Sequence, residues 1–334
     1  MENRVRGMMI AGIPGIVLLS AWLWTARPGI SEENRRIYEE AVGLQDQVDT
    51  LGFQGFCLSD YPVAMYDGKS EYVFGNGEVQ KRSPVLETFA GTVWPVGDHF
   101  EVIVPTVEQF GQLMSLTGGV EGMAAGSGYG PSEQKASIWH EAFHAYQLTD
   151  FAVLGEKVTA EDLQAELSDH KGAEEKSEEQ WIAEEVDEKP DLKKKLEGEM
   201  RLLKKAACDS DIDELHRTIL EYRECRRQRM EEMPAEAREA EIRCELTEGT
   251  AYYVESAVFR MASGGQAFEE RYLEGLDRYE NGRGKYYRTG FAKCMILDRL
   301  DSHWKETFDF SKGLDEVMAE YLRESGQEMQ MDGK

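Results

Sequence analysis

The chain has 334 residues, of which 64 are acidic and 38 basic, so its formal net charge at pH 7 is -26. This charge argues against nucleic acid as a ligand, because phosphate binding requires clustered cations, and it disfavours docking of the folded surface on anionic lipid. By length, the chain corresponds to about two domains, or to one domain with a large insertion. We favour the second interpretation.

The N-terminal segment predicts a single membrane span. Met8 to Trp24 is a 17-residue stretch without a charged side chain, which is near the short end of the length that a transmembrane helix needs. Two arginines precede it, so the positive-inside rule places the N-terminus in the cytoplasm and the catalytic part outside. The alternatives are a buried hairpin and a signal peptide cleaved after Ala26, which would make the protein secreted. We therefore expect residues 1–27 to anchor the chain in the lipid bilayer of the cell membrane.

Residues 28–155 are expected to contain a small mixed sheet. Thr88 to Pro95 and Phe100 to Pro105 are rich in aromatic or β-branched side chains and are bounded by Gly, Pro and Asp, which is typical of strands. The glycine-rich stretch Gly118 to Gly130 indicates an irregular edge strand or a solvent loop. Weaker patterns predict three further strands, at Phe53 to Leu58, Tyr61 to Tyr66 and Glu71 to Phe74. We expect this sheet to carry the edge along which a substrate binds.

The run His140-Glu141-Ala142-Phe143-His144 has the spacing of a hydrolytic zinc site. No proline or glycine interrupts Gln134 to Asp150, and Pro131-Ser132-Glu133 supplies an N-terminal helix signal, so the run is expected on a helix. Positions i and i+4 of a helix share one face, and His140 and His144 can therefore bind one tetrahedral cation. Glu141 then lies beside the metal, where the general base for a water molecule belongs. Because the five-residue pattern also arises by chance, a further ligand is required.

Three acidic residues downstream are candidates for the third ligand. Asp150 follows the histidines at a spacing used in one class of zinc proteases, but an unbroken helix would carry it about 240° around from His144. Glu248 is the better candidate, on a second helix that begins near Pro234. Glu245, one turn earlier, is its rival. Gly249 costs about 1 kcal/mol in a helix interior, which predicts that two backbones pass closely there.

Residues 156–233 are expected to form a charged helical insertion. Glu161 to Met200 is dominated by Glu, Asp and Lys, which predicts exposed helices joined at Gly172 and Pro190. Leu202 to Met233 predicts a helix that packs one face, since apolar residues recur there at helical spacing, namely Ile212, Leu215, Ile219 and Tyr222. Four arginines in this part are expected to pair with neighbouring glutamates, namely Arg223, Arg226, Arg227 and Arg229. An alternative role for the insertion is to bind a protein partner.

Residues 234–334 are expected to form a helical C-terminal part. Apolar groups recur at helical spacing in Gly290 to Leu300 and in Leu314 to Leu322. Trp304 lies between these runs and is expected to anchor the helices to the core. The polar residues from Gly326 onward are expected to fray.

The five cysteines include no C-x-x-C pair, so a structural zinc site is not indicated. Buried free thiols are the expected state, and a disulfide between Cys208 and Cys225 is the alternative. Cys244 lies one helical turn before Glu248, but we expect it to belong to the core.

Three segments together carry a family resemblance. The run His140 to His144, followed by Leu246-Thr247-Glu248-Gly249-Thr250-Ala251-Tyr252-Tyr253, resembles the gluzincin zinc metallopeptidases, whose third ligand is the glutamate of an L-N-E-G-x-A-x-Y segment. Tyr287-Arg288-Thr289-Gly290 is similar to the Y-x-x-G segment of the aminopeptidase-N-like branch, whose tyrosine stabilises the oxyanion. The resemblance implies that His140, His144 and Glu248 bind one Zn2+ per chain. It also implies that Glu141 is the general base and Tyr287 the oxyanion donor. Other donors remain open, namely Tyr286, Tyr252, Tyr146 and His303.

Two features depart from the family pattern. The family joins the second histidine to the glutamate by a short connection, whereas 103 residues, Ala145 to Thr247, intervene here. An insertion of this length is tolerable because the entropy of loop closure grows only with the logarithm of length. Gly118-Gly119-Val120-Glu121-Gly122 resembles the exopeptidase segment G-A-M-E-N only weakly, so Glu121 is interpreted as a loop residue and no aminopeptidase activity is inferred.

The sequence thus predicts an α+β protein with a zincin-like fold behind one transmembrane helix. We expect a membrane-anchored zinc metallopeptidase that hydrolyses peptide or protein substrates. The alternative is a non-catalytic surface protein that uses the zinc-binding scaffold to present its charged insertion. The presence of Glu141 together with both histidines and a downstream glutamate favours the enzyme.

Overall fold

The computed structural model describes residues 29–75, 77–117, 129–151, 153, 158–168, 177–208 and 211–324. Several predicted features lie outside the described residues, namely the span Met8 to Trp24, the glycine-rich stretch through Glu121, the junction at Gly172 and the C-terminal tail. The membrane anchor therefore stays a prediction. Within the described ranges, no helix is both long and apolar enough to span a bilayer.

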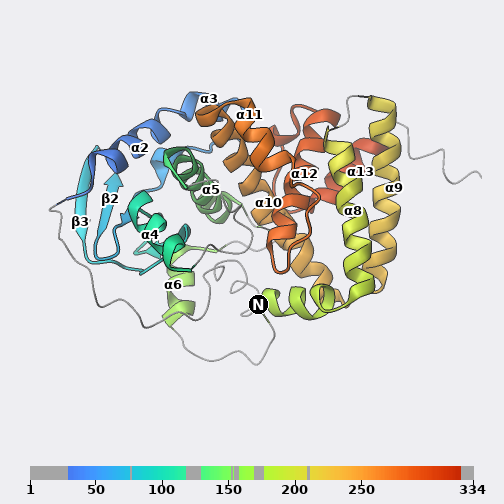
Figure 1. Ribbon diagram of the computed structural model, residues 1–334, viewed down its shortest axis with the longest axis horizontal. Coiled ribbons are helices and arrows are strands. Elements are labelled where there is room, and N and C mark those ends of the chain that lie inside the picture. The colour runs from blue at the N-terminus through green and yellow to red at the C-terminus, as the bar shows by residue number, and fades with distance from the viewer. Residues whose placement is uncertain are drawn as a thin grey trace, which may run out of the picture. The chain divides into compact units, whose positions relative to one another are not determined.

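The protein is α+β, with one small sheet and many helices (Figure 1). Its chain divides into two compact units. The described residues within Met1–Thr50, Gly55–Thr149 and Val158–Gly172 form unit 1. Those within Leu51–Gln54, Asp150–Lys157 and Ala173–Lys334 form unit 2.

Unit 1 contains a five-stranded mixed sheet with the strand order β3-β2-β1-β5-β4. The central strand β1 pairs parallel with β5 and antiparallel with β2, so that Val63 lies opposite Val102 on one side and Phe74 on the other. The outer pairs, β2 with β3 and β5 with β4, are antiparallel. The strands are β1 (Val63–Tyr66), β2 (Glu71–Gly75), β3 (Glu78–Arg82), β4 (Thr92–Val96) and β5 (His99–Pro105).

Four of the five predicted segments form strands, namely β1, β2, β4 and β5, and one prediction is wrong. No strand forms at Phe53 to Leu58 because Gly52 and Gly55 adopt φ angles of +96° and +76°, which turn the chain. Phe53 and Phe56 are nevertheless buried. Strand β3 was not predicted, since its sequence Glu-Val-Gln-Lys-Arg is mostly polar and largely solvent-exposed.

Helix α5 (Pro131–Asp150) is the buried centre of unit 1 and confirms the helix predicted around the two histidines. The indole Nε1 of Trp139 donates to the carbonyl of Ala41 at 3.1 Å. The side chain of Gln134 donates to the carbonyl of Pro105, at the end of β5, at 2.8 Å. These contacts fix α5 against both a helix and the sheet. The other helices of the unit are α2 (Glu32–Val42), α3 (Gln45–Asp49), α4 (Val107–Thr117) and α6 (Ala160–Ser168).

Unit 2 is helical. Helices α8 and α9 lie side by side, and α10 packs along α12 (Figure 1). Helix α7 continues directly into a π-helical segment, Ala183–Asp187. The helices are α7 (Glu178–Ile182), α8 (Pro190–Cys208), α9 (Ile212–Glu231), α10 (Ala235–Ser263), α11 (Gly265–Phe268), α12 (Gly284–Leu300) and α13 (Leu314–Glu324). Trp304 is buried, which confirms its expected place in the core.

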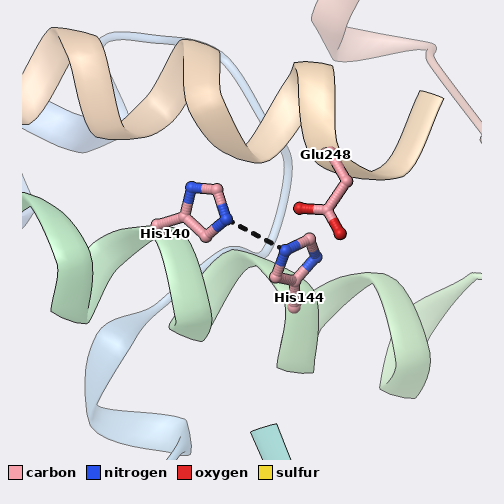
Figure 2. Close-up of side chains that lie close together, drawn as sticks. All are labelled: His140, His144 and Glu248. Atoms are coloured by element: carbon pink, nitrogen blue, oxygen red, sulfur yellow. Dashed lines mark hydrogen bonds between the residues drawn. The ribbon is translucent and has the colours of Figure 1, made fainter. Parts of the chain in front are cut away.

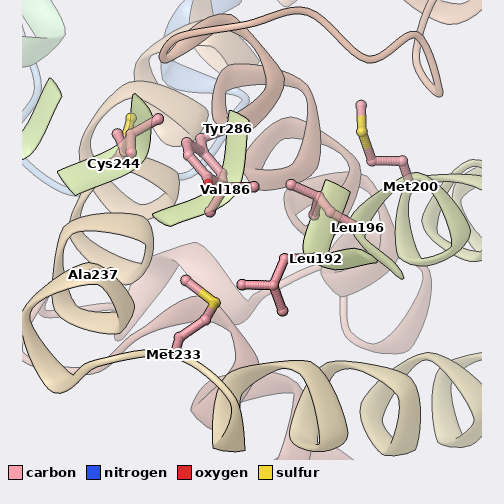
Figure 3. Packing of buried hydrophobic residues seen from close by; sticks show 9 residues of the cluster. Val186, Leu192, Leu196, Met200, Met233, Ala237, Cys244 and Tyr286 are labelled. Carbon is pink, nitrogen blue, oxygen red and sulfur yellow. The ribbon is translucent and has the colours of Figure 1, made fainter. Parts of the chain in front are cut away.

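One hydrophobic cluster joins the insertion to the C-terminal helices (Figure 3). Helix α8 contributes Leu192, Leu196 and Met200, so the prediction that this helix is exposed is wrong. The reason is its spacing, because apolar residues every fourth position bury one face while the lysines occupy the other. Cys244 belongs to the same cluster, which confirms it as a core residue. All five cysteines are free thiols, so the alternative Cys208–Cys225 disulfide is not formed. The expectation that the thiols are buried holds for Cys244 and Cys294 and is wrong for the other three, of which Cys208 is exposed.

Three of the four arginines expected to pair with glutamates do so, namely Arg226, Arg227 and Arg229, and two of these pairs lie inside the unit. The guanidinium of Arg229 donates to Glu199 at 2.7 and 2.8 Å and to Glu241 at 2.5 and 2.8 Å. Arg226 donates to Glu241 at 2.5 Å. Arg227 pairs with glutamates of its own helix at the surface.

Helices α10 and α12 cross at two glycines, which confirms the close backbone approach expected at Gly249. A Cβ atom on Gly249 would lie 2.4 Å from the Cα atom of Gly290. A Cβ atom on Gly290 would lie 2.3 Å from the carbonyl oxygen of Glu245. Both distances are shorter than any side chain tolerates, so the crossing requires glycine on both helices.

We expect Gly249→Ala to lower the free energy of unfolding by about 1–3 kcal/mol, because the added methyl group forces the two backbones apart. Urea denaturation of the metal-free protein measures this loss. The matched control is Gly198→Ala in α8, where the nearest atom to the new Cβ would be Arg201 Nη2 at 3.8 Å. That control is expected to be neutral or stabilising by up to about 1 kcal/mol. Equal stability of the two variants would show that the crossing accommodates a side chain.

Candidate metal centre

The two histidines of α5 face each other across one helical turn. Their Nε2 atoms are 3.1 Å apart, and the ring planes are inclined at 80°. Two nitrogen ligands of a tetrahedral zinc ion, each at its usual bond length, lie about 3.3 Å apart. The pair His140 and His144 therefore has the nitrogen spacing of a zinc site.

Gln147 orients the second histidine. Its side-chain oxygen is 2.8 Å from Nδ1 of His144, and its side chain is fully buried. Because an amide oxygen only accepts, Nδ1 of His144 carries the proton and Nε2 presents its lone pair. Sequence reasoning did not assign a role to Gln147. The sequence did contain one indication of this contact, because Gln147 follows His144 by three residues and therefore lies on the same face of the helix.

Glu141 is 9% exposed and lies against Gly91, the residue that precedes edge strand β4. A Cβ atom on Gly91 would lie 2.5 Å from Oε1 of Glu141. The carboxylate thus occupies space that a side chain at position 91 would take. This neighbour, 50 residues earlier in the chain, was not predicted.

Glu248 lies on α10 in unit 2 and is 3% exposed. Nη2 of Arg283 donates to Oε1 of Glu248 at 2.8 Å. Burial, followed by the charge of Glu248, raises the pKa of Tyr287 well above its ordinary value. The phenol therefore keeps its proton and acts as a donor.

The three predicted ligands form one group (Figure 2). His140, His144 and Glu248 each offer one ligand atom, and these atoms all lie within 4.8 Å of one another. Two imidazoles and one carboxylate are the donor set of a hydrolytic zinc site with an open position. No second group of this kind is found in the part of the chain that the structure describes.

The rival ligand Glu245 is engaged elsewhere. Its carboxylate accepts hydrogen bonds from Arg226 at 2.6 Å, from Lys293 at 2.6 Å and from Thr289 at 2.7 Å. Two cations therefore balance its charge inside unit 2. The side chain of the other candidate, Asp150, lies outside the described residues.

The alternative oxyanion donors occupy other surroundings. Tyr286 is fully buried in the hydrophobic cluster, and Tyr146 packs on Phe56 and Phe143. Tyr252 lies among aromatic rings, and His303 is an exposed residue that pairs with Glu306. The charge of the predicted ligand Glu248 acts on Tyr287, whose pKa it helps to raise.

Glu178, the first residue of α7, is a titratable group in the same part of unit 2. Its Oε1 atom is 3.2 Å from Nε of Arg243, whereas its buried Oε2 atom has no hydrogen-bond partner. Burial raises the pKa of Glu178 to about 7, against the opposing charges of Arg283 and Arg243. The folded protein thus binds this proton more tightly than the unfolded chain does.

This shift predicts a pH-dependent stability. The protonated Glu178 side chain contributes to the free energy of unfolding. This contribution is fully present below the unfolded pKa of 4.5 and is lost as the pH rises through about 7. It amounts to at most about 3 kcal/mol. Glu178→Gln, measured by urea denaturation of metal-free protein at pH 5 and pH 8, is expected to reduce the loss between these pH values. Glu188→Gln, an exposed residue that follows the π-helical segment, is the matched control. An unchanged loss in Glu178→Gln would assign the pH dependence to other groups.

Comparison of the chain with known protein families, with curated proteins and with solved structures found no match. The functional interpretation therefore depends on the residues of the site and on the resemblance of its motifs.

Proposed function

We propose that this protein is a zinc-dependent metallopeptidase that hydrolyses peptide bonds with Glu141 as general base. The observation that carries the proposal is the group formed by His140, His144 and Glu248, with Glu141 next to the first histidine in the chain. The same residues, in the same order, carry the sequence resemblance to gluzincins. The engagement of Glu245 by three donors supports Glu248 as the third ligand.

The donor set fits Zn2+, one ion per chain, held by two imidazole nitrogens and one carboxylate. Zinc bound by three protein ligands is a Lewis acid that polarises a carbonyl group and lowers the pKa of water to about 7. Gln147 supports this assignment, because its contact fixes the tautomer of His144 in which Nε2 can bind a metal.

The chain's own residues would move the protons. Glu141 accepts a proton from the attacking water and passes it to the leaving amine. Its burial limits competing hydration of the carboxylate. Tyr287 donates its phenolic hydrogen to the developing oxyanion, which stabilises the transition state more than the substrate. The charge of Glu248 helps to keep this phenol protonated, as the role of donor requires.

The position of β4 supports a peptide as the substrate. This strand is the last of the sheet, and Gly91 at its start contacts Glu141. An extended peptide that paired with β4 through main-chain hydrogen bonds would pass the general base. Such pairing is independent of side chains at most positions, which suits a peptide-bond hydrolase.

Digestion of a peptide library by the full-length protein tests the proposal. We expect cleavage by the zinc-loaded protein, loss of cleavage after removal of the metal with a chelator, and recovery when Zn2+ is returned, because the open ligand position is essential to the reaction. Mass spectrometry of the products identifies the cleaved bonds. Absence of cleavage by protein that holds one zinc ion per chain would contradict the proposal.

A further inference from the structure

Arg283 connects Glu248 to the charged insertion. Its Nη2 atom is 2.8 Å from Oε1 of Glu248, and its Nη1 atom is 3.1 Å from Oε1 of Glu179. The Arg283 side chain is 9% exposed and the Glu248 side chain 4% exposed. Arg283 precedes α12, Glu248 lies on α10, and Glu179 lies on α7, so three helices of unit 2 meet at this guanidinium.

The contact with Arg283 restricts the Glu248 carboxylate. A carboxylate so deeply buried requires a partner for its charge, and a charge-assisted hydrogen bond from a guanidinium is short and directional. A glutamate side chain otherwise rotates about three bonds, and a mobile ligand loses entropy when it binds a metal. Arg283 removes part of that freedom before any metal binds.

Glu179 offsets the charge that Arg283 brings. A lone guanidinium beside a metal ligand would repel a divalent cation, because like charges repel strongly where water is scarce. The ion pair with Glu179 offsets part of this charge. The pair also fixes the guanidinium plane from its far side, since each carboxylate binds a different nitrogen.

We propose that Arg283 is a positioning residue for the metal site, which holds the Glu248 carboxylate while Glu179 of α7 holds Arg283 and balances its charge. This inference rests on the proposed function, because it takes Glu248 as a metal ligand. It gives the charged insertion a role in metal binding, since α7 belongs to residues 156–233.

Zinc affinity of the full-length protein, measured by competition with a chromophoric chelator, tests the inference. Arg283→Gln is expected to weaken Zn2+ binding about 10- to 100-fold, the range seen when a group that orients a ligand is removed. Arg283→Lys is expected to give an intermediate loss, because one ammonium does not reproduce the fork that binds both carboxylates. The matched control is Arg288→Gln, in the helix α12 that follows Arg283, because the Arg288 guanidinium pairs with Glu280 at 2.7 Å. This control is expected to keep the wild-type affinity.

A double-mutant cycle separates positioning from general stability. Glu179→Gln is expected to weaken Zn2+ binding in the wild-type background and to have little further effect in Arg283→Gln, because both act through one guanidinium. The visible spectrum of the Co2+-loaded protein should shift in Arg283→Gln and stay unchanged in Arg288→Gln. Glu179 is partly exposed, so Glu179→Gln and Arg283→Lys keep the test decisive if Arg283→Gln does not fold.

The outcomes distinguish this inference from the proposed function. If wild-type protein binds zinc and hydrolyses peptides but Arg283→Gln and Glu179→Gln bind zinc equally well, only the role of Arg283 is overturned. Additive effects in the cycle would overturn it as well. If wild-type protein binds no zinc, the proposed function fails, and the inference fails with it.

Discussion

Glu141→Gln is expected to lower the rate of peptide hydrolysis about 10²- to 10⁴-fold, the usual contribution of a positioned general base. The amide that replaces the carboxylate is nearly isosteric, so Gly91 still has room beside it, but it does not accept a proton from water at neutral pH. The metal is expected to stay bound, because Glu141 lies beside the two histidines and is not one of the ligands. Steady-state kinetics on one cleaved peptide, with zinc content determined on the same sample, measures both quantities.

Glu133→Gln is the matched control for this experiment. Glu133 also lies on α5, but in its first turn, where its carboxylate accepts a hydrogen bond from the backbone of Gly130. We expect this variant to keep both zinc and activity. Equal activity of Glu141→Gln and wild type would rule out Glu141 as the base. Full zinc occupancy without any hydrolysis by wild type would favour the alternative of a non-catalytic zinc-binding surface protein.

The second prediction with a large expected effect tests whether Glu248 or Glu245 is the third zinc ligand. Glu248→Ala is expected to abolish tight zinc binding, because it removes one of three protein ligands. Glu245→Ala is expected to keep the zinc affinity and to lower the free energy of unfolding by about 3 kcal/mol, since it leaves two buried cations with fewer partners. Zinc titration and urea denaturation of the metal-free proteins measure the two effects independently.

The two variants have opposite signatures, so each serves as the control for the other. Glu245→Gln, which keeps the shape of the side chain, extends the test if the alanine variant does not fold. Loss of zinc from Glu245→Gln together with retention by Glu248→Ala would assign the third ligand to Glu245 and would contradict our assignment of this site.

Local patterns predicted the parts of the fold that depend on neighbours in sequence. Helix α5 follows from an uninterrupted helical run, and strands β4 and β5 follow from β-branched and aromatic residues between turn signals. The crossing at Gly249 was predictable, because a glycine in a helix interior is costly without a packing reason. These inferences required no knowledge of distant contacts.

Distant contacts account for what the sequence did not reveal. Glu245 and Glu248 lie one turn apart on the same helix, and only the partners of Glu245, such as Lys293 48 residues away, identify it as part of a buried ion network. The charged composition of Glu161 to Met200 predicted exposed helices, whereas Glu199 in α8 pairs with Arg229 inside unit 2. A charge pattern does not show which charges are paired after folding.

The same limit applies to the residues that surround the site. Gly91 and Arg283 act through tertiary neighbours, Glu141 and Glu248, that are far away in sequence. Neither residue has a motif of its own. Gln147 lies one helical turn after His144, so its proximity to the site could be predicted from the sequence. Its hydrogen bond to His144 could not, because that contact depends on the side-chain geometry.

X-ray absorption at the zinc edge of the zinc-loaded full-length protein tests the central claim most directly. The proposed site predicts one zinc ion per chain, bound by two imidazole nitrogens and by oxygen ligands at about 2.0–2.2 Å, without sulfur. The imidazole signal should fall in His144→Ala. A sulfur ligand at about 2.3 Å, or protein that retains no zinc after dialysis, would contradict the proposed metal centre.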